Sequence, residues 1–211
     1  MKQTTVAEQL LSKYPIISDQ ISRPAMKSVL EQLTDVLDRG IAGDIVEQGC
    51  YVGTTTLFLR RLLDYFNQTD IRRLYAYDSF EGLPSKTTHD NSGSGEQFKA
   101  GELQVTKKQF LHEFQRANLT PPITVKAWFK DIPDTQLPAH IAFAFLDGDF
   151  YESIIDSLRL VWPRLSPGAV IAIDDYQRAA LPGVERAVRD FFQAKSIQLH
   201  HEHNIAIIRR A

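Results

Sequence analysis

Apolar and polar positions follow two periods along most of the chain. After Gly43, short apolar runs (DIV, LYAY, ITV, IAFAF and GAVIAI) alternate with longer stretches whose apolar residues recur at helical spacing. A short apolar run predicts a buried strand, and an amphipathic stretch predicts a helix. Strand and helix in regular alternation are typical of a doubly wound α/β sheet with parallel strands.

The N-terminal region has a helical pattern and no strand pattern. Leu30, Leu33 and Leu37 lie near helical spacing, and Pro24 is placed to start this stretch. We therefore expect a helical N-terminal cap over residues 1–40 and one main domain over residues 41–211.

The C-terminal segment SIQLHHEHNIAIIRR breaks the alternation, because it predicts two strands joined by a short polar turn with no helix between them. A terminal hairpin on a parallel sheet predicts an antiparallel C-terminal edge strand. The histidines of the turn, His200, His201 and His203, could suggest a metal site, but a solvated hairpin turn is the favoured interpretation.

A long polar segment, LPSKTTHDNSGSGEQFKA, follows Gly82 and shows no periodicity. A structureless loop of this length inside a compact domain is usually a functional lid or disordered. We predict a lid over about residues 84–101.

Composition narrows the class of partner. The 211 residues, 43% hydrophobic and 24% charged, are those of one ordinary globular domain. Domains that bind nucleic acid are usually strongly basic, and the formal net charge of -2 does not have this character. No stretch approaches the roughly 18 apolar residues of a membrane span, and Cys50 is the single cysteine. We expect a cytoplasmic protein that binds a small molecule and neither nucleic acid nor membrane.

A glycine turn, EQGCYVGTTT, lies between the first predicted strand and its helix. Three residues separate Gly49 from Gly53, so the dinucleotide fingerprint G-x-G-x-x-G is not met and a pyrophosphate site is disfavoured. Glu47 suits a ligand with a positive amino group, although an ordinary strand-to-helix turn remains an alternative. Asp78 ends the next strand, where such folds place an acid on ribose hydroxyls; a turn or helix N-cap residue is its alternative.

Two acidic pairs end two other apolar runs: Asp147 and Asp149 in LDGDFYES, and Asp174 and Asp175 in IAIDDY. If these strands are parallel neighbours, their carboxyl ends converge on one crevice. A carboxylate cluster without Cys, and without His nearby in sequence, favours a hard divalent ion, Mg²⁺ first and Mn²⁺ or Ca²⁺ next. Capping of the following helices is the alternative.

In combination, these motifs resemble the macrocin and demethyldescarbamoylnovobiocin O-methyltransferases. These enzymes depend on S-adenosylmethionine and methylate hydroxyls, mainly on sugars of natural products. The resemblance runs from about Gly43 to the C-terminus and rests on the segments DIVEQGCYVG, YDSFEGLP, AWFKD, LDGDFYES and LSPGAVIAIDDY, in this order.

The resemblance implies a class I methyltransferase Rossmann-like fold with a seven-stranded, mostly parallel sheet. It also implies a sugar, glycoside or other hydroxylated acceptor, and leaves open whether the chain forms a homodimer. The implied roles are S-adenosylmethionine binding by Glu47, Gly49, Gly53, Asp78, Ser79, Asp131 and Asp147, binding of Mg²⁺ (or Mn²⁺) by Asp147, Asp174 and Asp175, and general-base catalysis by Asp149.

Three other interpretations of the sequence compete. Metal-dependent methyltransferases of the catechol or caffeoyl-CoA kind carry a lysine shortly after the first metal-binding acid, and GDFYES has none. An NAD-dependent oxidoreductase is disfavoured by the incomplete glycine fingerprint and by the terminal hairpin. A non-catalytic cofactor-binding module would not need a base next to a metal site.

Overall fold

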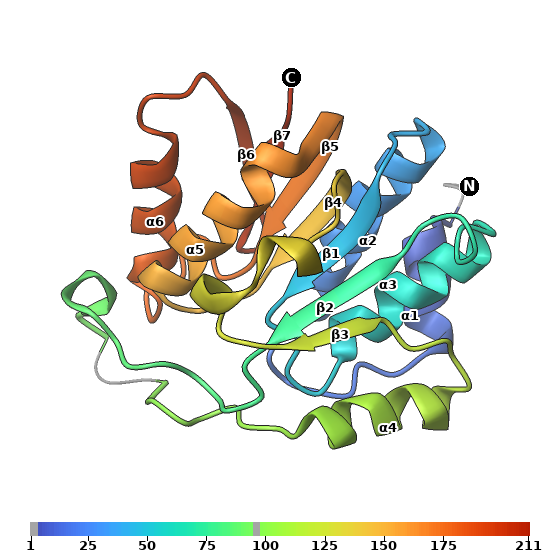
Figure 1. Ribbon diagram of the computed structural model, residues 1–211, viewed down its shortest axis with the longest axis horizontal. Helices are drawn as coiled ribbons and strands as arrows, with labels where there is room; N and C mark the ends of the chain where they lie inside the picture. Colours follow the sequence, from blue (N-terminus) through green and yellow to red (C-terminus); the bar gives the residue numbers. More distant parts are fainter. Residues whose placement is uncertain (1–3, 95–97) are drawn as a thin grey trace.

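The computed structural model describes residues 4–94 and 98–211 and follows the predicted alternation of elements (Figure 1). None of the helices within these ranges is long and apolar enough to cross a bilayer. In chain order the elements, with η for 3₁₀ turns, are α1 (Val6–Lys13), α2 (Arg23–Asp38), β1 (Asp44–Gln48), α3 (Thr54–Tyr65), β2 (Leu74–Asp78), η1 (Thr88–Asp90), α4 (Lys107–Ala117), β3 (Ile123–Lys126), η2 (Phe129–Asp131), η3 (Asp134–Gln136), β4 (Ile141–Leu146), α5 (Tyr151–Val161), η4 (Trp162–Arg164), β5 (Leu165–Ile173), α6 (Pro182–Phe192), β6 (Gln198–Glu202) and β7 (Ile205–Arg209).

The strands form one seven-stranded sheet in the order β3-β2-β1-β4-β5-β7-β6. The pairs from β3 to β5 are parallel, and β7 is antiparallel to both β5 and β6. The predicted mostly parallel sheet with an antiparallel C-terminal hairpin is confirmed. Within the hairpin the apolar strand β7 is the inner one, because its residues 205–208 are buried, while the polar β6 forms the edge.

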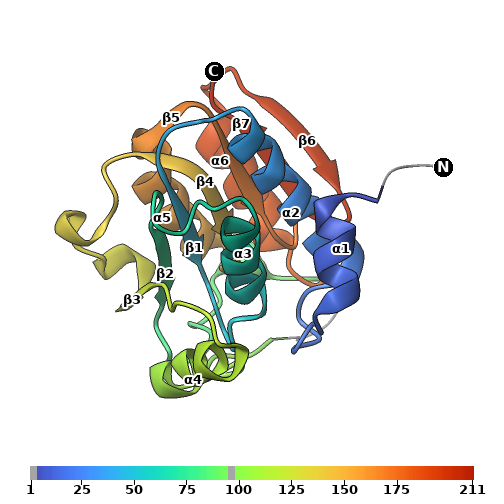
Figure 2. The same cartoon turned by 90° about the vertical axis from the view of Figure 1, so that its right-hand side faces the viewer.

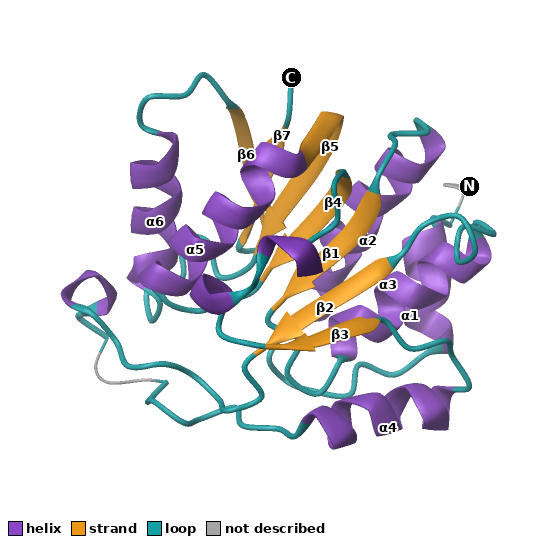
Figure 3. Cartoon of the chain, in the orientation of Figure 1, coloured by secondary structure: helices purple, strands orange, loops and turns teal. Residues whose placement is uncertain are grey.

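Helices cover both faces of the sheet (Figures 2 and 3). On one face α2 and α3 share a buried cluster with β1 and β4 that contains Val29, Leu33, Ile45 and Phe143. On the other face α5 and α6 pack over the same strands. Residues 23–38, predicted as part of a cap, therefore belong to the layer that covers the sheet, and a domain division near residue 40 stays a prediction.

The strand order reverses beside β1, since β2 lies on one side of it and β4 on the other. The connections that leave the carboxyl ends of β1, β2, β4 and β5 consequently meet at one edge of the sheet. Open α/β sheets bind their ligands at such a switch point.

The segment predicted as a lid packs against the body of the protein in its described part. Thr88–Asp90 forms η1, and Ser92 Oγ donates a hydrogen bond to the carbonyl oxygen of Ala179 at 2.6 Å. Residues 95–97 of the predicted lid lie outside the described residues.

Candidate active site

A pocket of about 440 Å³ opens at the carboxyl ends of the strands. Its lining contains six of the predicted site residues: Gly49, Asp78, Ser79, Asp147, Asp149 and Asp175. A smaller pocket shares Gly49 and Asp147 with it and adds Glu47. The structure thus brings most of the predicted residues to one place.

The two glycines of the turn after β1 have different surroundings. Gly49 has φ +89°, and a Cβ there would lie 1.9 Å from the carbonyl oxygen of Asp147. Only glycine permits this close approach of the β1 turn to the end of β4. Gly53 also has positive φ, but a Cβ there would lie 3.0 Å from the ring of Phe110, and Gly53 lines neither pocket. Its predicted contact with a cofactor stays a prediction.

Asp78 is fixed by backbone donors. Its Oδ2 accepts from the N–H groups of Cys50 at 2.9 Å and Tyr51 at 3.1 Å, and its Oδ1 accepts from Phe80 at 2.7 Å. An ionised carboxylate has about four acceptor sites, so roughly one stays available for a ligand hydroxyl. The neighbouring Ser79 Oγ donates to the carbonyl oxygen of Gly82 at 3.3 Å and so helps to shape this turn.

Glu47 is a buried acid, with 1% of its surface exposed. Its Oε2 has no hydrogen-bond partner among the described residues. Burial, opposed by the Thr56 hydroxyl and reinforced by the charge of Asp78, raises the pKa of Glu47 to about 8. Because an unpartnered buried carboxyl oxygen is costly, a cationic amino group beside it would be a favourable partner.

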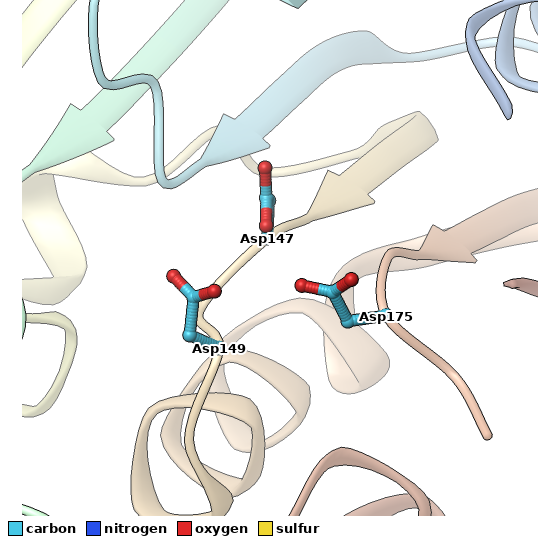
Figure 4. Close-up of side chains that lie close together, drawn as sticks. All are labelled: Asp147, Asp149 and Asp175. Carbon is cyan, nitrogen blue, oxygen red and sulfur yellow. The ribbon is translucent and has the colours of Figure 1, made fainter. Parts of the chain in front are cut away.

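Three carboxylates converge at the ends of β4 and β5 (Figure 4). One oxygen each from Asp147, Asp149 and Asp175 lies within 4.8 Å of the other two. Asp174 lies outside this group; its Oδ1 accepts from the N–H of Asp175 at 2.8 Å. The predicted convergence of the two strand ends is therefore present, with Asp149 drawn into the cluster.

Ionised together, the carboxylates of the cluster would carry more negative charge than their surroundings balance. Burial raises the pKa of Asp147 and of Asp149, and the neighbouring carboxylates raise both further. Burial and the charge of Asp175 raise the pKa of Asp174 to about 8. Within the described chain, Arg178 is the ion-pair partner of this cluster, with its NH1 2.6 Å from Asp175 Oδ1. One partly exposed arginine leaves the other carboxylates uncompensated, so the donor set fits a hard divalent cation.

The turn that carries Asp149 is tight. Asp149 has φ +60°, and the N–H of Phe150 donates to the carbonyl oxygen of Gly148 at 2.6 Å. The N-cap residues of α5 and α6 are Phe150 and Leu181, neither with a side-chain capping bond. The alternative that the four acids cap these helices is therefore wrong.

Two features of the site differ from the sequence interpretation. Gln20 lines both pockets, and Ser18 Oγ accepts from Thr54 Oγ1 at 3.0 Å, so the segment before α2 reaches the site. No local motif marks these residues, because their proximity depends on how α2 packs. Asp131 is exposed and outside the pocket lining, which is formed instead by Trp128, Phe129 and Lys130. The adenine contact implied for Asp131 stays a prediction.

Comparisons with known proteins identify the family of this chain. The family described as Macrocin-O-methyltransferase (TylF) matches residues 14–206. The 8-demethyl-8-(2,3-dimethoxy-alpha-L-rhamnosyl)-tetracenomycin-C 4'-O-methyltransferase of Streptomyces olivaceus is 35% identical over 74% of this chain, and the match spans only 60% of that protein. The mycinamicin III 3''-O-methyltransferase of Micromonospora griseorubida is 29% identical over 84% of this chain and 72% of its own.

A solved structure shows the same fold. The O-methyltransferase NovP superposes with a TM-score of 0.75 and 25% identity over 88% of this chain and 79% of its own. The class I methyltransferase fold implied by the motifs is confirmed.

Proposed function

This chain belongs to the macrocin O-methyltransferase (TylF) family, and from that premise we propose that it is an S-adenosylmethionine-dependent O-methyltransferase. The acceptor would be a hydroxyl of a sugar, a glycoside or another hydroxylated natural product. The names of two relatives support this class of acceptor, since they describe O-methylation of a rhamnosyl tetracenomycin and of mycinamicin III.

The cofactor would lie across the carboxyl ends of β1 and β2. Glu47 has the unpartnered oxygen to receive the amino group of the methionine part, and Gly49 lets the turn after β1 pass close to the carbonyl of Asp147 beside it. Asp78 would accept from a ribose hydroxyl, in an orientation that three backbone N–H groups already fix. Gly53 would shape the turn after β1, and Ser79 would shape the turn after β2.

The cation, Mg²⁺ or Mn²⁺, would be held at the acid cluster. Asp147 and Asp175 belong both to the predicted ligand set and to the set that converges in the structure. The third ligand is Asp174 by the family resemblance and Asp149 by proximity. Bound there, a divalent cation would lower the pKa of an acceptor hydroxyl and fix its direction.

Asp149 would accept the proton of the acceptor hydroxyl at a carboxylate oxygen while the hydroxyl oxygen takes the methyl group. An ordinary Asp, with a pKa of about 3.9, is a weak base at neutral pH. Burial and the neighbouring acids raise the pKa of Asp149 in the metal-free chain, and a cation bound to those acids would keep Asp149 ionised and able to take the proton. The pocket walls would hold the two reactants in line, an effect that can be worth about 7 to 11 kcal/mol.

One observation carries the proposal: the cofactor-binding turn with Asp78 and the three-carboxylate cluster line the same pocket. The test is methyl transfer from labelled S-adenosylmethionine to a panel of glycosides and catechols, in EDTA and after Mg²⁺ is restored. We expect product from a glycoside and only when the cation is present. Transfer to no acceptor would contradict the enzymatic proposal, and equal rates in EDTA would contradict the metal assignment.

The same panel separates the alternatives. Preference for catechols would favour the catechol-type enzymes, and cofactor binding without transfer to any acceptor would favour a non-catalytic module. Cytoplasmic location and the absence of nucleic-acid or membrane partners stay predictions, and the oligomeric state is open.

A further inference from the structure

Asp90 is a buried acid with 2% of its surface exposed, in a loop that sequence patterns mark only as polar. Its Oδ2 accepts from the N–H of Thr87 at 2.8 Å and from Thr87 Oγ1 at 3.0 Å. Its Oδ1 accepts from the N–H of Tyr151 at 2.7 Å. Both oxygens are therefore used, one within the loop and one across to α5.

The contact with Tyr151 replaces a missing local cap. Tyr151 is the first residue of α5, whose N-cap Phe150 makes no side-chain capping bond. The first N–H groups of a helix need partners from outside the helix, and an anionic partner is favoured there. Asp90 provides that partner from 61 residues away in sequence.

Gly183, near the start of α6, makes room for this contact. A Cβ at Gly183 would lie 2.0 Å from Asp90 Oδ1 and 2.9 Å from the backbone nitrogen of Tyr151. The backbone of Gly183 is not in the left-handed region, so alanine would fit the helix itself. The space left by this glycine is thus occupied by the Asp90 carboxylate.

Asp149 lies two residues before Tyr151, at positive φ in the turn closed by the N–H of Phe150. On its other side, the N–H of Asp147 donates to the carbonyl oxygen of Gln48 at 2.8 Å. The turn is therefore held at the end of β4 by β1 and at the start of α5 by Asp90. These two contacts restrain the backbone on either side of Asp149.

We propose that Asp90 is a positioning residue that fixes Asp149 through the N-terminus of α5. This inference rests on the proposed function for its kinetic test, because the role assigned to Asp149 is catalytic. Asp90 itself touches no reacting atom.

Other contacts dock the same loop and provide a matched control. The ring of His89 stacks on Tyr151 with 4.0 Å between centroids, and Arg186 NH1 donates to the carbonyl oxygen of His89. Ser92 Oγ holds the loop to Ala179 without contacting α5. Ser92→Ala therefore weakens loop docking and spares the bond to Tyr151.

The experiment compares Asp90→Ala, Asp90→Asn, Gly183→Ala and Ser92→Ala in methyl transfer. Loss of an outer positioning partner typically costs about 10- to 100-fold in activity. We expect a fall of this size in kcat for Asp90→Ala and Gly183→Ala, with the KM for S-adenosylmethionine unchanged within about twofold. Asp90→Asn keeps an oxygen for Tyr151 and should recover part of kcat, and Ser92→Ala should lose much less than Asp90→Ala.

Backbone amide NMR signals of Asp149 and Tyr151 give a readout independent of activity. Both should shift in Asp90→Ala and Gly183→Ala and stay in place in Ser92→Ala. Unmoved Asp149 signals in a folded Asp90→Ala variant, or equal kinetic losses in Ser92→Ala and Asp90→Ala, would overturn the proposal. If the wild-type chain transfers no methyl group, the proposed function fails while these signals still decide the role of Asp90.

Discussion

Asp78 ends β2 and Asp149 follows β4 at the same edge of the sheet, yet their surroundings are opposite. Asp78 accepts hydrogen bonds from three backbone N–H groups. Asp149 lies among carboxylates that raise its pKa. The chain itself completes the half of the site around Asp78, where we propose that the methyl donor S-adenosylmethionine binds (the donor half). In the half around Asp149, where we propose that the acceptor hydroxyl binds (the acceptor half), we propose that a cation completes the site. The difference teaches that, on this proposal, backbone donors preform the donor half, whereas a bound cation completes the acceptor half.

The largest expected effect concerns the acceptor half. Asp149→Asn keeps the shape of the side chain but cannot accept the proton, so turnover should fall by about 10²-fold or more. Binding of S-adenosylhomocysteine should change little, because the donor half is intact. Steady-state kinetics and calorimetry on the same preparation measure both quantities. Normal turnover in this variant would remove Asp149 from the mechanism.

The second effect concerns metal affinity and distinguishes Asp174 from Asp149 as the third metal ligand. Asp175→Asn removes a ligand present in both candidate sets, and its affinity for Mg²⁺ or Mn²⁺ should fall by at least about tenfold. If Asp174 binds the ion, Asp174→Asn should lower the affinity for the ion as much as Asp175→Asn does. If Asp149 binds it instead, Asp174→Asn should lower this affinity less. Titration of the metal-free variants with Mn²⁺, followed by electron paramagnetic resonance, distinguishes the two. Unchanged affinity in Asp175→Asn would contradict both sets.

A third effect concerns stability and pH. The pKa of Asp174 is raised to about 8 in the folded state, from about 3.9 in an unfolded chain. The folded state therefore binds this proton more tightly, so the contribution to stability is present below about pH 4 and is lost as pH rises towards 8. The Tm of metal-free wild-type protein should fall between about pH 4 and pH 8 more than that of Asp174→Asn.

Addition of Mg²⁺ gives a second test of how Tm depends on pH. Because the ion binds the deprotonated acids, it should raise the wild-type Tm more at high pH than at low pH. Equal Tm profiles for wild type and Asp174→Asn, with no response to Mg²⁺, would show that repulsion within the cluster does not control the stability of the protein in this pH range.

The smallest effect lies in the donor half. Glu47 has a pKa of about 8, so at neutral pH it is mostly protonated until an amino group binds its ionised form. Binding of S-adenosylhomocysteine should therefore release a proton, and its affinity should rise with pH below about 8, by up to about tenfold per unit. Calorimetry in two buffers of different ionisation enthalpy measures the release. Glu47→Gln should lose it, and a wild-type protein that releases no proton would contradict this role.

Sequence patterns predicted the contacts that depend on regular structure. Asp147 and Asp175 follow neighbouring parallel strands, so their convergence follows from the strand alternation. The positions of Asp90 and Gln20 could not be predicted in this way. Gln20 lies in an irregular segment and Asp90 in a short 3₁₀ turn, and each reaches the site region through long-range packing. Asp131 lies in a short 3₁₀ turn whose residues Phe129 and Lys130 line the pocket, and the adenine contact implied for Asp131 stays a prediction.

The most direct test of the contrast between the two halves is a calorimetric titration with S-adenosylhomocysteine, in EDTA and in Mg²⁺, with NAD as the control. A preformed donor half predicts binding with a similar Kd in both conditions and none for NAD. Binding that requires Mg²⁺, or no binding in either condition, would contradict the claim that the chain alone completes the donor half.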